Sequence, residues 1–158
     1  MSVGIDGLVP RIEALVLEEI DLQRRVLANL ASQEVALIAA DGAGLDELLD
    51  QARRLIQETA PREARRRMIL KDFERLWGVS AKSLTLGSIA ARLEGSGRRL
   101  KRLRTELLDV LREVARTGSR VRTFARFQQG IIRETVERVI ESEGGKSKDS
   151  GSLINAEA

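Results

Sequence analysis

The chain has 158 residues, of which 42% are apolar and 32% are charged. This balance is typical of one folded domain with a strongly charged surface and argues against a disordered chain. The sequence contains no Cys, His or Tyr. Disulfides, Cys or His metal sites, His-based catalytic triads and Cys nucleophiles are therefore excluded. The composition consequently argues against an enzyme, and it predicts neither a cofactor nor a metal site.

The net charge of +3 is unevenly distributed along the chain. Residues 1–61 carry 5 basic and 11 acidic side chains, a net charge of −6, whereas residues 62–104 carry 13 basic and 4 acidic side chains, a net charge of +9. Residues 105–158 carry 9 of each. The middle third is therefore a basic zone whose role has to be explained.

The beginning of the sequence and its hydropathy bear on localisation. Residues 1–10 lack a basic stretch followed by an apolar core, which argues against a signal peptide. No segment approaches the ~20 continuous apolar residues of a membrane span. We therefore expect a cytoplasmic protein that does not insert into a membrane.

The first predicted helix covers residues 8–40. Its apolar side chains recur at intervals of three, four or seven residues, the spacing that lines one side of a helix. They are Leu8, Ile12, Leu15, Leu22, Val26, Leu30 and Leu37. The segment Asp41-Gly42-Ala43-Gly44 then predicts a short turn in which a glycine ends the helix in the left-handed conformation. So short a turn indicates that the next helix folds back antiparallel to the first.

The second predicted helix covers residues 45–77 and contains Pro61. The proline ring removes one helical hydrogen bond and clashes with the preceding turn, which predicts a kink or a short break near Thr59. Alternatively, Thr59 caps a new helix that has Pro61 in its first turn. Gly78 is expected to end this helix as its C-terminal cap.

A short connector and a very long helix complete the predicted elements. The connector helix covers residues 85–94, with Thr85 as its N-cap. The final helix covers residues 98–142, and the Gly-, Ser- and Lys-rich segment 143–158 is expected to be a disordered tail. The predicted fold is all-α. It is a single domain over residues 1–142, in which a long antiparallel helical hairpin and a long C-terminal helix form an elongated three-helix bundle or coiled coil.

Four short segments, taken in order, resemble the FlgN family of flagellar export chaperones. The turn Ala39-Ala40-Asp41 leads into Leu45-Asp46-Glu47-Leu48, which is similar to the family pattern ALVANDLEALEEL. The second helix ends in Leu76-Trp77-Gly78-Val79-Ser80, similar to LGLS. The connector Leu84-Thr85-Leu86-Gly87-Ser88-Ile89 resembles LTLSEL. The resemblance covers about residues 10–140, although Thr117-Gly118-Ser119 stands where the family often has two Asn residues.

The resemblance implies a function and a set of partners. Proteins of this family bind the hook-associated junction proteins FlgK and FlgL in the cytoplasm and keep them unassembled. They then deliver these proteins to the flagellar type III export gate. The resemblance further implies that the C-terminal part of the chaperone holds the cargo.

The final helix is expected to carry the partner-binding surface. Around the helix axis, the apolar residues between Leu100 and Val114 span ~160°, whereas those between Phe124 and Ile140 span ~220°. The second arc is wider than one packing seam, so we expect one edge to pack on the hairpin and the other to bind a partner helix. The candidate residues are Val121, Phe124, Phe127, Gln128, Ile131, Ile132, Thr135, Val136, Val139 and Ile140. Burial of both edges, by the hairpin or by a second copy of the chain, is the alternative.

Two basic clusters, residues 65–67 and residues 98–104, keep a nucleic-acid-binding function open. A basic nucleic-acid-associated protein would use them to contact phosphates, but no aromatic residues are interleaved and no DNA-binding motif is present. Nucleic acid is therefore not the favoured partner. The alternative is a solvated face that pairs with the acidic first helix. A coiled coil that assembles with itself as a homo-oligomer is the third function considered.

Overall fold

The computed structural model describes residues 4–154, with side chains described as far as Glu143 and Gly144. Over this part of the chain the structure is helical and contains no strand, which confirms the predicted all-α fold. The elements are α1 (Ile5–Ile38), α2 (Gly42–Gln57), α3 (Thr59–Trp77), the 3-10 helix η1 (Ala81–Ser83), α4 (Leu86–Arg92), the 3-10 helix η2 (Glu94–Gly97) and α5 (Arg98–Ile154).

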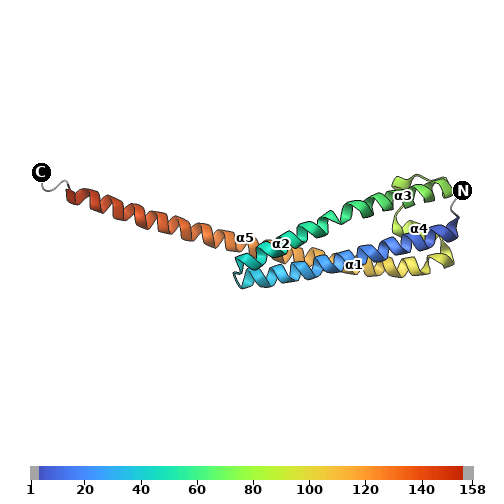
Figure 1. Cartoon of the computed structure of the whole chain (residues 1–158), viewed down its shortest axis with the longest axis horizontal. Helices are drawn as coiled ribbons and strands as arrows, with labels where there is room; N and C mark the ends of the chain where they lie inside the picture. The colour runs from blue at the N-terminus through green and yellow to red at the C-terminus, as the bar shows by residue number, and fades with distance from the viewer. Residues whose placement is uncertain (1–3, 155–158) are drawn as a thin grey trace.

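Helix α1 is the central element, since it packs against α2, α3 and α5. The chain reverses between α1 and α2, so α2 and α3 run antiparallel to α1, as the sequence predicts (Figure 1). Helix α5 runs parallel to α1. Arg99 pairs with Glu13 near the start of both helices, and Arg120 pairs with Glu34 further along both. The bundle therefore has two ends: the α4 end, which holds the start of α1 and the start of α5, and the hairpin end, where α1 turns into α2.

The apolar core lies in the half of the bundle at the α4 end. It is built from the first half of α1, the second half of α3, α4 and the first turns of α5. Its fully buried large side chains include Leu8, Ile12, Ile20, Phe73, Ile89 and Leu100. Phe73 stacks on Trp77 with a distance of 4.7 Å between ring centroids. Helix α4 closes this end of the bundle, and a capping box between Thr85 and Ser88 begins it, which confirms Thr85 as the N-cap.

The hairpin half has a more polar interior. Asn29 donates a hydrogen bond to the main-chain oxygen of Leu48 (2.9 Å) and accepts one from Gln33 (2.6 Å). Both amide side chains are buried, as is Thr117 of α5. None of the residues of α2 is buried. The interior here is therefore held by hydrogen bonds as well as by apolar contacts.

The turn between α1 and α2 differs from the predicted glycine cap. Ala40, not a glycine, adopts the left-handed conformation (φ 53°). The N–H of Asp41 bonds to the oxygen of Ala36 (2.9 Å) and that of Ala40 to the oxygen of Leu37 (3.2 Å), which is the Schellman pattern of a helix C-terminus. Asp41 then caps α2 by accepting a bond from the N–H of Gly44 (2.9 Å), so α2 begins at Gly42 rather than Leu45.

The predicted break near Pro61 is real, but Thr59 does not cap it. Helix α2 ends at Gln57, Glu58 forms the turn, and Pro61 lies in the first turn of α3. The hydroxyl of Thr59 donates to the oxygen of Ile56 (2.6 Å) and so closes the end of α2 instead. Because Pro61 has no N–H, a position in the first helical turn costs no hydrogen bond.

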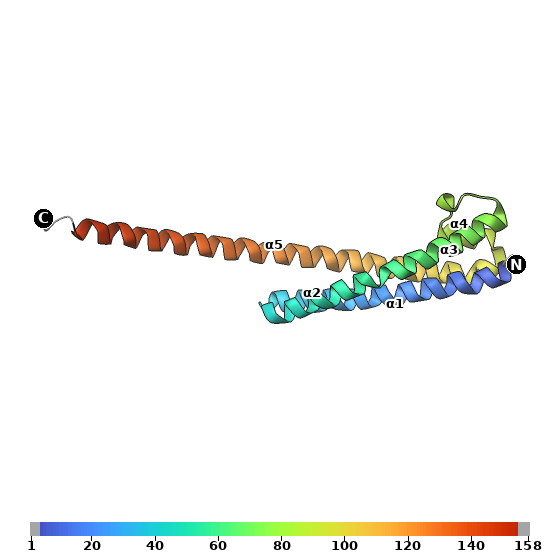
Figure 2. The same ribbon diagram turned by 45° about the horizontal axis from the view of Figure 1, so that its top comes forward.

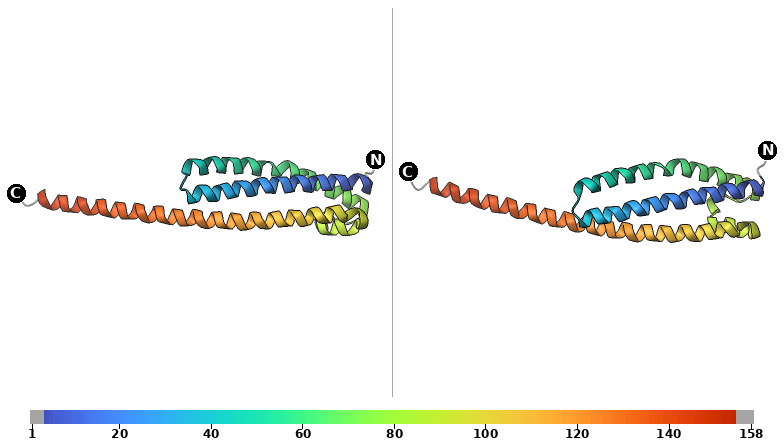
Figure 3. Two further views of the ribbon diagram at one scale, coloured as in Figure 1. Left: turned by 90° about the horizontal axis from the view of Figure 1, so that it is seen from below. Right: turned by 60° about the horizontal axis from the view of Figure 1, so that its bottom comes forward.

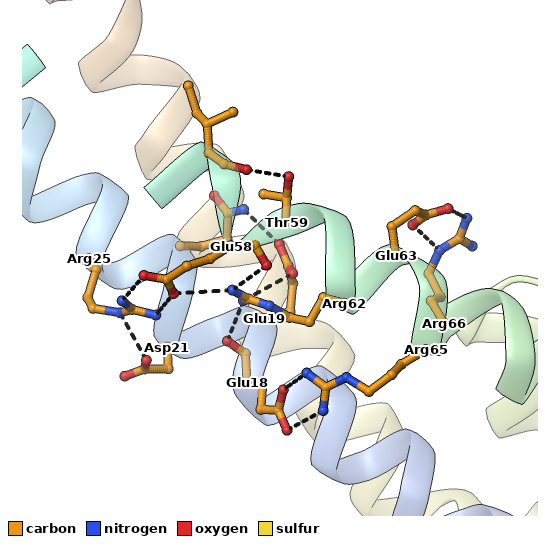
Figure 4. Close-up of polar contacts among 12 residues, drawn as sticks. Glu18, Glu19, Asp21, Arg25, Glu58, Thr59, Arg62, Glu63, Arg65 and Arg66 are labelled. Carbon is orange, nitrogen blue, oxygen red and sulfur yellow. Dashed lines mark hydrogen bonds and ion pairs between the residues drawn. The ribbon is translucent and has the colours of Figure 1, made fainter. Parts of the chain in front are cut away.

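Arg62 holds this junction against α1 (Figure 4). Its guanidinium is buried and donates to the main-chain oxygens of Glu18 (3.0 Å) and Glu58 (3.3 Å). It also lies 3.6 Å from the carboxylates of Glu19 and Glu58. Burial of this charge is tolerated because each of these partners is an acceptor.

Helix α5 begins at Arg98, as predicted, but does not end near residue 142. It continues to Ile154, twelve residues beyond the predicted end of the helix and into the predicted tail. Residues 155–158 of that predicted tail lie outside the described residues. The physical reason is that no proline follows Pro61, and glycine and serine weaken a helix that is already formed without breaking it.

Candidate partner-binding surface on α5

Helix α5 leaves the bundle at the hairpin end and continues alone (Figures 2 and 3). Its contacts with the end of α1 are an ion pair between Arg120 and Glu34 (3.2 Å) and a hydrogen bond from the side chain of Gln128 to the main-chain oxygen of Leu37. Helix α1 ends at Ile38. Every residue of α5 from Gln129 to Gly144 is exposed.

The structure divides the ten candidate residues into two groups. Val121 is buried, and Phe124 and Gln128 are half-buried where α5 still packs on the bundle. Val121 thus belongs to the bundle core, and the amide of Gln128 is already hydrogen-bonded to α1. The other seven are exposed. They are Phe127, Ile131, Ile132, Thr135, Val136, Val139 and Ile140.

These seven residues are called the α5 stripe below. Phe127 is 66% exposed, Ile132 62% and Ile140 63%. Their spacing of three and four residues places most of them on one broad side of the helix. The hydroxyl of Thr135 donates to the oxygen of Ile131 (2.8 Å), so this residue adds little polarity to the stripe.

Ion pairs between side chains of α5 itself lie beside the stripe. Arg133 pairs with Glu137 (3.1 Å) and Arg138 pairs with Glu134 (2.6 Å), each across one turn of the helix. Such pairs support an isolated helix by only ~0.2–0.5 kcal/mol each. A lone helix in water is marginally stable even when its sequence favours helix. An amphipathic helix gains most of its stability when its apolar face packs against a neighbour. The geometry therefore fits a surface that is completed by another helix.

Every arginine of the basic cluster at residues 65–67 has a carboxylate partner, but only Arg65 pairs with the acidic first helix, as the alternative of a solvated face predicts. Arg65 forms two bonds with Glu18 of α1, and Arg66 bonds to Glu63 (Figure 4). Arg67 also donates to Glu63 (3.3 Å). The hydrogen bonds from Arg66 lower the pKa of the Glu63 carboxyl from 4.5 to about 2. The hydrogen bond from Arg65 likewise holds the pKa of Glu18 below its ordinary value.

The cluster at residues 98–104 behaves differently. Among the described side chains, only Arg99 of this cluster forms an ion pair, with Glu13 at 3.3 Å. The sequence did not indicate that the two basic clusters would differ, because their charge densities are similar and only the tertiary contacts distinguish them.

A groove of about 500 Å³ was not predicted from the sequence. It lies among α1, α3, α4 and α5, with an apolar floor that includes Leu15, Ile69 and Leu107 and a charged edge that includes Glu19 and Arg66. The groove arises because α3 and α5 pack on different sides of α1. Helical periodicity gives the apolar face of each helix but not the gap between two helices, so no sequence signal was available.

The described residues contain neither a helix that could span a membrane nor a group of side chains that could hold a metal ion. No helix within residues 4–154 combines the length and apolar character needed to cross a membrane. Over the same part of the chain, acidic side chains do not gather in a group of three or more that could hold a metal ion.

Comparison with known protein families identifies the family of this chain. A sequence model described as FlgN protein matches residues 1–145, which is most of the chain. The chain belongs to the FlgN family. This family consists of flagellar export chaperones. No curated protein and no solved structure gave a match.

Membership of the FlgN family confirms the resemblance drawn from the four sequence segments. The matched region includes all five α-helices at least in part and the whole α5 stripe. In this FlgN-family chain, the exposed apolar surface is therefore part of the family domain rather than of an appended segment.

Proposed function

We propose that this chain is a cytoplasmic export chaperone for hook-associated junction proteins of the FlgK and FlgL type. The α5 stripe binds an amphipathic helix of the cargo and keeps it from assembling prematurely. The chaperone then delivers the cargo to the flagellar export gate. The proposal rests chiefly on one observation: α5 extends beyond the bundle with its apolar residues exposed.

The chemistry of the stripe supports this proposal. Burial of one large aliphatic or aromatic side chain contributes about 1.5–3 kcal/mol. Phe127 is the largest apolar side chain of the stripe and an anchor of the kind that dominates helix interfaces. Export cargo has to be released again, and contacts on a single exposed helix can dissociate without unfolding the bundle.

Binding assays with purified FlgK and FlgL from the same organism test the proposal. The informative variant is Phe127→Ser combined with Ile132→Ser, which removes two exposed side chains of the stripe. We expect at least a ~30-fold loss of affinity, the effect of losing one or two interface anchors. The melting temperature should stay unchanged, because neither side chain is buried in the bundle.

A matched control uses two apolar residues that are equally exposed elsewhere. Ile56 is 67% exposed and Met68 is 61% exposed, and both lie outside α5. The combined variant Ile56→Ser and Met68→Ser should bind FlgK and FlgL like the unmodified chain. Equal losses in both variants, or no binding of either cargo by the unmodified chain, would refute the assignment.

Self-association through the stripe is distinguished in the same experiment. If a second copy occupies the stripe, the unmodified chain will sediment as a dimer, and the Phe127→Ser and Ile132→Ser variant will sediment as a monomer. A dimer that never binds FlgK or FlgL would favour the structural coiled coil over the chaperone.

A further inference from the structure

Five exposed cations occupy the first two turns of α5. Arg99 pairs with Glu13, and the other four, Arg98, Lys101, Arg102 and Arg104, are called the α5 basic face below. Around the helix axis they span ~160°, on the side away from the buried residues Leu100 and Leu103. No acidic residue lies between Arg98 and Arg104.

The α5 basic face is unpaired within the part of the chain whose side chains are described. Seventeen ion pairs are present among these side chains, and none of them includes Arg98, Lys101, Arg102 or Arg104. The other basic cluster, by contrast, has a carboxylate partner for every arginine. Internal pairing therefore explains the first cluster and leaves the second unexplained.

The stability of α5 does not explain these cations either. The N-terminus of a helix carries a partial positive charge, and a cation in the first turn is unfavourable by about 0.3–1 kcal/mol at an exposed site. Arg98 and Lys101 lie in this first turn. Acidic residues would stabilise the helix there, so the basic face works against the local preference of its own backbone.

Helix α4 leaves room for one of the four side chains. Arg104 lies against Gly87, where a Cβ atom would be 3.3 Å from the Arg104 Nε. A side chain at position 87 would require the guanidinium to shift by a few tenths of an ångström. The absence of a side chain at Gly87 thus permits Arg104 to stay beside α4 while the other three cations face outward.

We propose that the α5 basic face is a docking site for an acidic polypeptide segment on a second protein partner. Seven helical residues extend ~10 Å, which matches about three residues of an extended chain. An acidic segment of that length would offer up to three carboxylates to the four cations. The proposed cargo surface is not needed for this contact.

The extent of the face favours a protein segment over nucleic acid. Beyond Arg104, the exposed carboxylates of Asp109 and Glu113 are paired with Arg112 (3.0 Å) and Arg116 (2.9 Å). The run of unpaired cations therefore ends after two helical turns, which is short for a surface that follows the phosphates of a duplex. The face also lacks aromatic residues on which single-stranded bases could stack.

The position of the face adds a consequence that rests on the proposed function. Lys101 and Ile132 are separated by about 47 Å along α5, at 1.5 Å per residue. Cargo on the α5 stripe would therefore leave the basic face free. One chain binds cargo at one end and the acidic partner at the other, at the same time.

The test measures binding of a short labelled peptide of alternating Glu and Ser to the full chain. The variant combines Arg98→Gln, Lys101→Gln and Arg102→Gln. Its matched control combines Arg54→Gln, Arg122→Gln and Arg126→Gln, which removes the same charge from exposed arginines that lack an ion pair among the described side chains. We expect about a tenfold loss of affinity in the first variant and less than about twofold in the control.

Three results would overturn the proposal. The unmodified chain could fail to bind the acidic peptide, or the two variants could lose affinity equally, which would reduce the effect to net charge. The third is that a DNA duplex, an oligonucleotide or phosphatidylserine vesicles depend on the basic face while the peptide does not. FlgK binding by the same variants is a separate readout, so failure here is distinguishable from failure of the chaperone assignment.

Discussion

The apolar residues of α5 are buried at one end of the bundle and exposed at the other. At the α4 end, Leu100, Leu103 and Leu107 are buried against α1 and α4. At and beyond the hairpin end, Phe127, Ile131 and the other apolar residues of the stripe are exposed. The two stretches belong to one continuous helix, so the difference lies in what the rest of the chain supplies as neighbours.

This difference shows how an elongated chaperone can separate folding from binding. The apolar core at the α4 end is closed by α3 and α4. The projecting part of α5 has no neighbour within the described bundle, so its apolar surface stays exposed. Substitutions in the two stretches should therefore affect different properties: stability at one end and binding at the other.

The largest expected effect on stability comes from substituting two phenylalanines, one in each stretch of the chain. Phe73 is fully buried and Phe127 is 66% exposed. Phe73→Ala removes a ring from the core and should lower the free energy of unfolding by about 3–5 kcal/mol. Phe127→Ala should change it by less than about 0.5 kcal/mol. Urea unfolding followed by circular dichroism measures both values.

Comparable losses in the two variants would contradict the division. That result would mean that Phe127 is covered in solution, by a second copy of the chain or by a bend of α5 onto the bundle. Repeating the unfolding at several protein concentrations separates these explanations, because only self-association makes the apparent stability depend on concentration.

Two glycines provide a comparison of intermediate size with opposite signs. A Cβ atom at Gly97 would lie 2.2 Å from the main-chain oxygen of Ala90, whereas nothing lies within 4 Å of one at Gly130. Gly97→Ala should therefore destabilise the chain by about 1–3 kcal/mol through forced displacement of α4. Gly130→Ala should stabilise the projecting helix locally by up to about 1 kcal/mol.

Amide hydrogen exchange is the appropriate measurement for the second substitution. Gly130→Ala should slow exchange in the turns around Ile131 and Thr135 and leave the core around Phe73 unaffected. A stabilised core with unchanged exchange near Ile131 would indicate that the end of α5 is not an independent helix.

Local chemistry made several features of the fold predictable from the sequence. The left-handed cap at Gly78, the N-cap at Thr85 and the start of α5 at Arg98 each follow from residues close in sequence. The left-handed residue at the hairpin was not predictable, because Ala40 is held there by hydrogen bonds to the end of α1. Likewise, Thr59 resembles an N-cap, but its hydroxyl bonds backward to Ile56.

The sequence predicted the apolar arc of the candidate site, but not the residue of α5 at which its exposed part begins. Periodicity identified the broad apolar arc of α5, yet it could not show where α1 ends beside it. That point separates buried Val121 from exposed Ile131. The pairing of one basic cluster and not the other also depends on tertiary contacts, since Glu18 and Arg65 are 47 residues apart in sequence.

The smallest expected effect concerns acid. Arginines hold the pKa of Glu18, Glu58 and Glu63 below the ordinary value of 4.5, and that of Glu63 is about 2. A carboxylate with a depressed pKa stabilises the folded state above its unfolded pKa and loses this contribution as the pH falls through the folded pKa. The melting temperature should therefore fall between about pH 4.5 and pH 2. The decrease should be small, because these carboxylates are solvent-exposed and screened.

The variant Glu63→Gln identifies the source of this acid sensitivity. It cannot titrate, so its melting temperature should change less with pH over the same interval than that of the unmodified chain. Asp46→Gln alters an exposed carboxylate that forms no ion pair among the described side chains, and it should leave the pH dependence unchanged. If Glu63→Gln and Asp46→Gln behave alike, the pairs of Glu63 with Arg66 and Arg67 do not cause the acid sensitivity.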